Sequence, residues 1–254
     1  MSETFSLAGR VALVTGAGNG LGRATALHLA AMGATVGVND LKQEFVDRTV
    51  ADIIAAGGQA IGMTGNVSTR EGMRAVVLGL AERAGRLDVL VNNAAWVRYQ
   101  AVPDIAAETM DRMLDIGFKA VIWGIQAAAE VMDAERGGCI INIASVAAIT
   151  GLQNGLVYCG IKAGVTGITR AAAAELGPRG IRVNAIAPSA IPTEGTMRNR
   201  NAERDARRVA RTPLGRLGAV EDIARAVGFL ASGQSGFVTG QVLVVDGGVT
   251  TSNL

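Results

Sequence analysis

The order of apolar and polar positions along the chain predicts alternating strands and helices. Short apolar runs rich in β-branched residues predict strands with helices on both faces, because such strands show no polar alternation. The predicted strands are Val11–Val14, Thr35–Val38, Ala60–Met63, Val89–Val91, Ile140–Ile143, Arg182–Ile186 and Val242–Val245. Between them, apolar residues at helical spacing predict Leu21–Met32, Gln43–Ala56, Arg70–Arg83, Met110–Asp133, Tyr158–Leu176 and Val220–Ala231. This alternation is typical of repeated βαβ units, and therefore of an α/β fold with a parallel sheet.

The composition is that of one folded domain. Of the 254 residues, 49% are hydrophobic and 18% are charged, which excludes a disordered chain. With no Pro/Ser-rich linker and no fixed repeat, we expect a single domain over residues 1–254. Residues 137–161 carry no charge and have the length of a membrane span, but polar residues and glycines interrupt them. They predict a buried strand, a loop and the start of a helix.

Charge and cysteine content exclude several classes of function. A formal net charge of +2 offers no general attraction for nucleic acid or for a membrane surface. Two cysteines, Cys139 and Cys159, with no C-x-x-C motif predict neither a disulfide framework nor a metal site. The first ten residues lack the features of a signal peptide, so we expect a cytoplasmic protein.

A glycine-rich turn follows the first predicted strand. Residues 15–22 read T-G-A-G-N-G-L-G, with Leu21 where the common G-x-G-x-x-G pattern has its third glycine. Glycines let the backbone turn tightly into a helix whose free N–H groups and dipole suit a pyrophosphate. The segment therefore predicts a dinucleotide-binding turn, although a strand-to-helix turn without a ligand explains the same glycines.

Asp40 closes the second predicted strand, about 20 residues after these glycines. A carboxylate there can accept hydrogen bonds from the ribose hydroxyls of adenosine and would repel the 2′-phosphate of NADP. Asn19 stands within the turn, no Arg or Lys does, and Lys42 is the only cation expected nearby. The pattern favours NAD, with a helix N-cap as the alternative role of Asp40.

Ser145, Tyr158 and Lys162 form the second candidate group. Tyr158 and Lys162 are four positions apart on a predicted helix and therefore share one face. A lysine beside a tyrosine is expected to lower the phenol pKa and make it a general acid or base. Ser145 follows the strand that ends at Ile143, where ligands bind in open α/β sheets, and its hydroxyl can hold a substrate oxygen. By itself, Ser145 is equally typical of a loop.

Taken together, these motifs resemble the classical short-chain dehydrogenase/reductase family over essentially the whole chain. The segments that carry the resemblance are Thr15–Gly22, Asn92–Ala95, Ser145, Tyr158–Lys162 and Val183–Pro188. It implies a Rossmann fold, that is, a doubly wound, mostly parallel seven-stranded sheet with helices on both faces. It further implies hydride transfer between a nicotinamide cofactor and a secondary alcohol or ketone, and a homotetramer.

The resemblance also implies roles for individual residues. Ser145 would polarise the substrate, Tyr158 would act as acid and base, and Lys162 would contact the ribose and adjust the tyrosine. The residues that would bind NAD are Gly16, Asn19, Gly20, Leu21, Gly22, Asp40, Asn66, Val67, Asn93, Tyr158, Lys162, Pro188, Ile191 and Thr193. Of these, Asn66 and Val67 would meet the adenine, Asn93 the adenosine ribose, and Ile191 and Thr193 the nicotinamide carboxamide.

Gly117 is the main departure from the family. It takes the place of an asparagine that helps to order a water between the active-site lysine and solvent. We therefore expect an active enzyme with a weakened proton relay. Two alternatives stay open: an NADPH-dependent ketoreductase of the 3-oxoacyl type, and a dinucleotide-binding protein without catalytic activity.

The segment 193–218 is rich in arginine and corresponds to a substrate lid in the resembled family. Its arginines suit an anionic substrate or an acidic carrier protein. A solvated helix face is the stronger interpretation, because Glu203 and Arg207 have the spacing of helical partners. Arg98 could likewise contact a substrate or be a charged residue of a surface loop. The identity of the substrate does not follow from the sequence.

Overall fold

The computed structural model describes residues 5–194 and 201–252. Seven strands form one sheet in the order β3-β2-β1-β4-β5-β6-β7, and every neighbouring pair is parallel. The strands are β1 Val11–Val14, β2 Thr35–Val38, β3 Gln59–Gly62, β4 Val89–Asn92, β5 Gly138–Ile143, β6 Ile181–Pro188 and β7 Val242–Val245. All the predicted strands are confirmed, with boundaries that differ by at most two residues.

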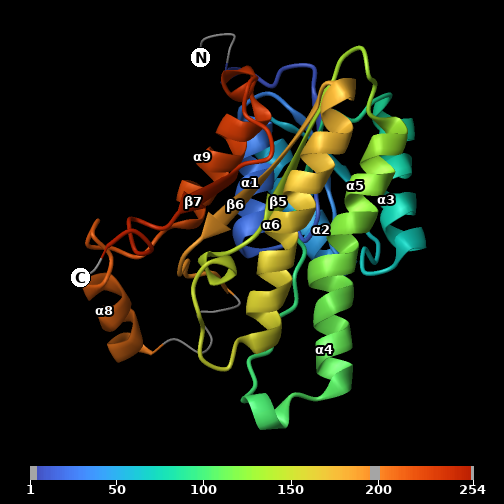
Figure 1. Ribbon diagram of the computed structural model, residues 1–254. Coiled ribbons are helices and arrows are strands. Elements are labelled where there is room, and N and C mark those ends of the chain that lie inside the picture. The colour runs from blue at the N-terminus through green and yellow to red at the C-terminus, as the bar shows by residue number, and fades with distance from the viewer. Residues whose placement is uncertain (1–4, 195–200, 253–254) are drawn as a thin grey trace.

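Helices cover both faces of the sheet (Figure 1). On one face lie α1 Gly20–Ala31, α2 Gln43–Ala55 and α9 Val220–Ala231; on the other lie α3 Arg70–Ala84, α5 Ala120–Val131 and α6 Leu156–Leu176. This is the doubly wound α/β arrangement that the sequence predicted. Among the described residues, no helix is long and apolar enough to cross a membrane. Residues 137–161 divide into β5, a short 3₁₀ turn and the first turns of α6.

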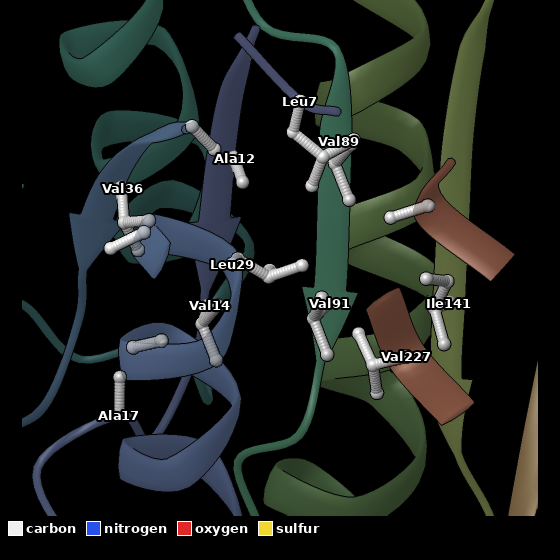
Figure 2. Packing of buried hydrophobic residues seen from close by; sticks show 14 of the residues in the cluster. Leu7, Ala12, Val14, Ala17, Leu29, Val36, Val89, Val91, Ile141 and Val227 are labelled. Carbon is white, nitrogen blue, oxygen red and sulfur yellow. The ribbon is translucent and has the colours of Figure 1, made fainter. Parts of the chain in front are cut away.

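The larger part of the core lies between the sheet and the layer of α1, α2 and α9. Leu29 of α1 and Val227 of α9 are fully buried against the strands, with Val14, Val91 and Ile141 on the facing side of the sheet (Figure 2). A second cluster fills the space between the sheet and α3, α5 and α6. Because each central strand meets apolar side chains above and below, its sequence is mostly apolar on both faces.

One predicted helix is interrupted. Residues 110–133 were expected to form a single helix, but α4 spans Ala107–Leu114, a π-helical turn occupies Asp115–Lys119, and α5 begins at Ala120. A π turn adds one residue to a helical turn and often marks a functional site. Hydrophobic periodicity does not detect such an insertion, because apolar residues on both sides of it still face the core.

The strand order reverses between β2 and β4, which flank β1 on opposite sides. Ligands of open α/β sheets bind beyond the carboxyl ends of the strands at such a reversal. The loops after β1, β2, β4 and β5 meet on this side, and α4 and α8 (Ala202–Ala210) project beyond the sheet there (Figure 1). The fold therefore gathers the glycine-rich turn, Asp40 and Ser145 at one edge.

Two adjacent isoleucines of α2 test how much of the stability depends on this packing. Ile53 is 1% exposed and Ile54 is 58% exposed. We expect Ile53→Ala to lower the free energy of unfolding by about 2–5 kcal/mol, because it leaves a cavity under α2. Ile54→Ala, the matched control, should change it by about 0.5 kcal/mol or less. Urea unfolding followed by circular dichroism measures both, and equal losses would contradict the described orientation of α2.

Candidate active site

The glycine-rich turn brings backbone segments closer together than side chains would allow. Gly16 and Gly20 have φ values of 63° and 53°, in the left-handed region that favours glycine. A Cβ atom at Gly22 would lie 2.1 Å from the carbonyl oxygen of Gly16, and one at Gly18 would lie 2.6 Å from a carboxylate oxygen of Asp40. The turn leads into α1, whose N-cap residue Asn19 makes no side-chain capping bond. The first N–H groups of α1 are therefore available to an anion.

Residues directly after β4 hold this turn in place. The amide nitrogen Nδ2 of Asn93 donates to the carbonyl oxygens of Thr15 and Gly16 at 2.8 and 3.2 Å. The hydroxyl of Thr15 accepts from the backbone nitrogens of Asn93 and Ala94 at 3.0 and 3.1 Å. Asn93, predicted as a ribose contact, thus lies at the turn with its side chain engaged by the backbone.

Asp40 lies at the tip of β2 and is joined to the same turn. Its Oδ2 atom accepts from the backbone nitrogen of Gly18 at 3.1 Å. The alternative role as the N-cap of α2 is not what the structure has, because that position belongs to Lys42. The predicted pairing of the glycine-rich turn with an acidic residue after β2 therefore exists in the fold.

The charge near this turn differs from the prediction in one respect. Lys42 was expected to be the only nearby cation, but Arg48 of α2 donates from Nη2 to the carbonyl oxygen of Gly18 at 2.7 Å. Arg48 also lies 3.6 Å from Glu194 and over the ring of Phe45. Arg48 is 30 positions away from Gly18 in the sequence, so the local pattern around the glycines does not indicate it. The helix α2 brings it back over the turn.

Ser145, Tyr158 and Lys162 meet beyond the end of β5. Ser145 is 8% exposed, and its hydroxyl is hydrogen-bonded to Tyr158 while it accepts from the backbone nitrogen of Ala147. Tyr158 and Lys162 share a face of α6, with the Lys162 Nζ atom 5.8 Å from the centre of the Tyr158 ring. The three predicted catalytic side chains are thus brought together.

The expected pKa of Tyr158 is wrong in direction. Burial raises the pKa of the phenol above its ordinary value of 10, and the hydrogen bond from Ser145 opposes this only in part. Lys162 is directed elsewhere: Nζ donates to the carbonyl oxygen of Ile143 at 2.7 Å. Loss of solvation therefore outweighs the opposing hydrogen bond with Ser145.

Gly117 lies in the π-helical turn, against α6. It is buried, and a Cβ atom at this position would lie 3.1 Å from Cγ2 of Ile161, the residue before Lys162. A side chain at position 117 would therefore press on the part of α6 that carries the lysine. The departure found in the sequence therefore lies next to the segment of α6 that carries Lys162.

The remaining predicted cofactor residues lie at the same edge of the sheet or in loops beside it. Thr193 lies against the glycine-rich turn, since a Cβ atom at Gly20 would be 3.3 Å from its side chain. Pro188 ends β6, and Ile191 packs on the main core. Asn66 is exposed and Val67 is buried, in the loop before α3.

In the segment 193–218, residues 195–200, with Arg198 and Arg200, lie outside the described residues. The described part contains α8, in which Arg207 and Glu203 form the expected pair at 3.2 Å. Most of α8 is exposed, as a solvated helix face predicts.

Sequence analysis did not single out two groups that the structure places at or below this edge. Tyr99, in the loop after β4, lies edge-on to Tyr158 with ring centres 5.8 Å apart. Asn92, Asn142 and Thr169 form a buried chain of hydrogen bonds that ties β4 and β5 to α6. The sequence does contain a sign of the second group. Its three polar residues stand at strand and helix positions where an apolar residue is expected.

Comparison with known proteins gives the family. Residues 16–250 match the family model described as enoyl-(acyl carrier protein) reductase. The chain is 38% identical to cyclohexanol dehydrogenase from Acinetobacter sp. (strain SE19) over 99% of this chain and 98% of that protein. It is 39% identical to a 3-oxoacyl-(acyl-carrier-protein) reductase from Thermotoga maritima over 96% of this chain and 98% of that protein.

Solved structures agree over nearly the full length. A gluconate 5-dehydrogenase from Burkholderia cenocepacia, in complex with NADP and tartrate, superposes with a TM-score of 0.94 at 33% identity, covering 98% of both chains. A 7α-hydroxysteroid dehydrogenase, complexed with NADH and 7-oxo glycochenodeoxycholic acid, gives the same TM-score and identity, covering 98% of this chain and 97% of the other.

The chain belongs to the short-chain dehydrogenase/reductase family, a family of oxidoreductases that use nicotinamide dinucleotides. The site fits such a cofactor on its own geometry: the uncapped start of α1, the turn with no room for side chains and the carboxylate of Asp40 suit a dinucleotide. The solved relatives bind NADP or NADH, so they do not decide between the two.

Lys162 predicts a pH-dependent cost in stability. Burial lowers its pKa from 10.5 to about 8. Below pH 8 the lysine is charged in the folded and unfolded states, and folding carries the full cost of burying it. Between about 8 and 10.5 only the unfolded state keeps the proton, so this cost disappears as the pH rises.

Lys162→Met should therefore raise the free energy of unfolding at neutral pH by up to about 3 kcal/mol, and by less as the pH approaches that of free lysine. Urea unfolding at several pH values measures the difference. Lys119→Met, at an exposed lysine of the π turn, is the control and should give no such gain. A gain for Lys162→Met that does not change with pH would contradict the assignment to ionisation.

Proposed function

We propose that this protein is an NAD-dependent oxidoreductase that interconverts a secondary alcohol and its ketone. The observation that supports this most directly is the group of Ser145, Tyr158 and Lys162 beyond β5, at the same edge of the sheet as the glycine-rich turn. A phenol and a hydroxyl at one point can hold a carbinol or carbonyl oxygen and move its proton.

In this proposal the side chains handle the oxygen and the proton. Ser145 holds the substrate oxygen, and Tyr158 exchanges a proton with it. Because burial raises the pKa of Tyr158, the phenol keeps its proton at neutral pH, which is the form that donates to a ketone oxygen. Oxidation of the alcohol needs the phenolate, so it should become faster with rising pH.

Lys162 would keep α6 in register with β5 through Ile143, and its ammonium would remain beside the phenol and within reach of a bound ribose. The bound dinucleotide supplies the acceptor for the hydride that leaves the carbinol carbon. Alcohol and oxidised dinucleotide thereby give ketone, reduced dinucleotide and a proton.

NAD is proposed over NADP because Asp40 is fixed where the adenosine ribose would lie. A carboxylate that accepts from Gly18 stands at the edge of the turn, where it would repel a 2′-phosphate. Arg48 favours the alternative, an NADPH-dependent reductase of the 3-oxoacyl type, since a guanidinium at the turn can attract that phosphate. Glu194 at 3.6 Å offsets part of the charge of Arg48.

A dinucleotide-binding protein without catalytic activity is the remaining alternative. Gly117 supports it, since the family's asparagine is missing beside the lysine. The assembled serine, tyrosine and lysine argue against it, because a binding protein needs no phenol at the reacting position.

Turnover by Tyr158→Phe decides between catalysis and binding alone. We expect the wild type to reduce NAD with members of a panel of secondary alcohols, and Tyr158→Phe to lose about 100-fold or more in kcat. Absorbance of the reduced cofactor measures both, with Tyr99→Phe as a control that removes the other tyrosine hydroxyl of the chain. Binding of NAD without any turnover that Tyr158→Phe abolishes would favour the binding protein.

Asp40→Asn tests the cofactor preference. The amide still offers an oxygen to the Gly18 N–H but carries no charge, so the ratio of kcat/KM for NADP to that for NAD should rise about tenfold or more. Asp47→Asn, which removes an exposed charge from α2, should leave the ratio unchanged. A wild type that already prefers NADP would contradict the proposal. If Arg48→Ala then lost this preference for NADP, the preference would be assigned to Arg48.

A further inference from the structure

We infer that Tyr99 determines substrate specificity and that the substrate is a neutral secondary alcohol or ketone carried on an apolar ring. This rests on the proposed function, since it concerns the substrate of the same site. It adds a chemical class and a residue that selects it.

The ring of Tyr99 forms a wall beside the proposed acid and base. The centres of the Tyr99 and Tyr158 rings are 5.8 Å apart and their planes meet at 81°. Two nearly perpendicular rings form a corner, and Tyr99 remains 53% exposed. A flat apolar ring can pack on Tyr99 while its carbinol group faces the hydroxyl of Tyr158.

The loop that carries Tyr99 is held on both sides of the residue. Gln100 donates from its backbone nitrogen to the carbonyl oxygen of Asn154 at 2.9 Å, which joins the loop after β4 to the loop before α6. On the other side, Trp96 lies under the guanidinium of Arg112 in α4, 4.2 Å from the ring centre. The position of Tyr99 is therefore set by the backbone and by Trp96, and the outward part of its ring is free to contact a ligand.

The segment joined to this loop is uncharged and exposes several large aliphatic side chains. Residues 137–161 contain no Asp, Glu, Lys or Arg. Ile149, Leu152 and Leu156 are 60%, 41% and 59% exposed, although large aliphatic side chains usually avoid solvent. An apolar substrate that packs on these side chains would remove their surface from water.

Among residues 5–194 and 201–252, the charges near Tyr99 are Arg98 and Arg208, and neither is placed as an isolated anion-binding group. Arg98 is exposed and is the only charged residue between positions 89 and 103. Arg208 of α8 is near enough to act on Tyr99 but lies 3.8 Å from the buried carboxylate of Asp205. This surface suits a neutral ligand.

The experiment compares a ring alcohol with a small acyclic one. For Tyr99→Ala we expect kcat/KM for cyclohexanol to fall about 10- to 100-fold, because the ring loses its wall, with less than about a threefold change for 2-propanol. Tyr99→Phe should keep the wild-type ratio, because the aromatic face remains. Val97→Ala, in the same loop, is the matched truncation and should leave the ratio unchanged.

Three results would overturn the inference. They are an equal fall for both alcohols in Tyr99→Ala, a loss of the ratio in Tyr99→Phe, or a wild type that oxidises gluconate but not cyclohexanol. The first would assign Tyr99 a general structural role, the second would assign selection to its hydroxyl, and the third would make the substrate a charged polyol.

A binding measurement separates this inference from the proposed function. Calorimetric titration of cyclohexanone into Tyr158→Phe with NADH present requires no turnover, and addition of Tyr99→Ala to this variant should weaken binding about tenfold or more. If no alcohol is turned over but Tyr99→Ala weakens the binding of cyclohexanone, the proposed catalysis fails. The inferred chemical class of the ligand is then retained. If turnover is observed but binding is indifferent to Tyr99, the inference fails alone.

Discussion

The glycine-rich turn is held by the strand beside it, and the arrangement of the site depends on that contact. Asn93 and Ala94 donate four hydrogen bonds to Thr15 and Gly16 across the β1 and β4 ends, each worth about 1 kcal/mol but costly to leave unmade in a buried place. These bonds engage the carbonyl oxygens of Thr15 and Gly16. The N–H groups at the start of α1 have no side-chain cap. Asp40 is fixed by the same turn through Gly18. The acceptors, donors and charge that suit a dinucleotide thus form one rigid unit.

A buried ammonium group defines the other half of the site. Lys162 is 6% exposed and donates to the backbone of Ile143, so that α6 is joined to the end of β5 at the level of Ser145 and Tyr158. Burial of a charge lowers stability unless it is compensated, and such groups persist mainly where they serve function. The buried lysine therefore lowers the stability of the fold. It lies next to the π turn, where position 117 is a glycine and has no side chain.

The two halves differ in how they are built. The cofactor side consists of strand ends and a helix start, which the parallel sheet fixes. The side proposed to bind the substrate consists of loops after β4 and β5 joined by Gln100 and Asn154, together with the neighbourhood of α8. Relatives of similar identity carry names that imply quite different substrates, among them cyclohexanol and a 3-oxoacyl group.

Much of this protein follows from the sequence by itself. The alternation of apolar runs and helical spacing predicted the strands and the α/β class, and short motifs selected Gly16, Asp40, Ser145, Tyr158 and Lys162 as candidates for the site. These signals are local, since each depends on residues within a few turns of one another. The tertiary structure decided what depends on solvation and on contacts between distant segments. Burial reversed the expected pKa of Tyr158, α2 returned Arg48 to the glycine-rich turn, a π turn divided one predicted helix, and two joined loops placed Tyr99 beside Tyr158. No local pattern encodes them, because water exclusion and distance in space are set only when the whole chain has packed.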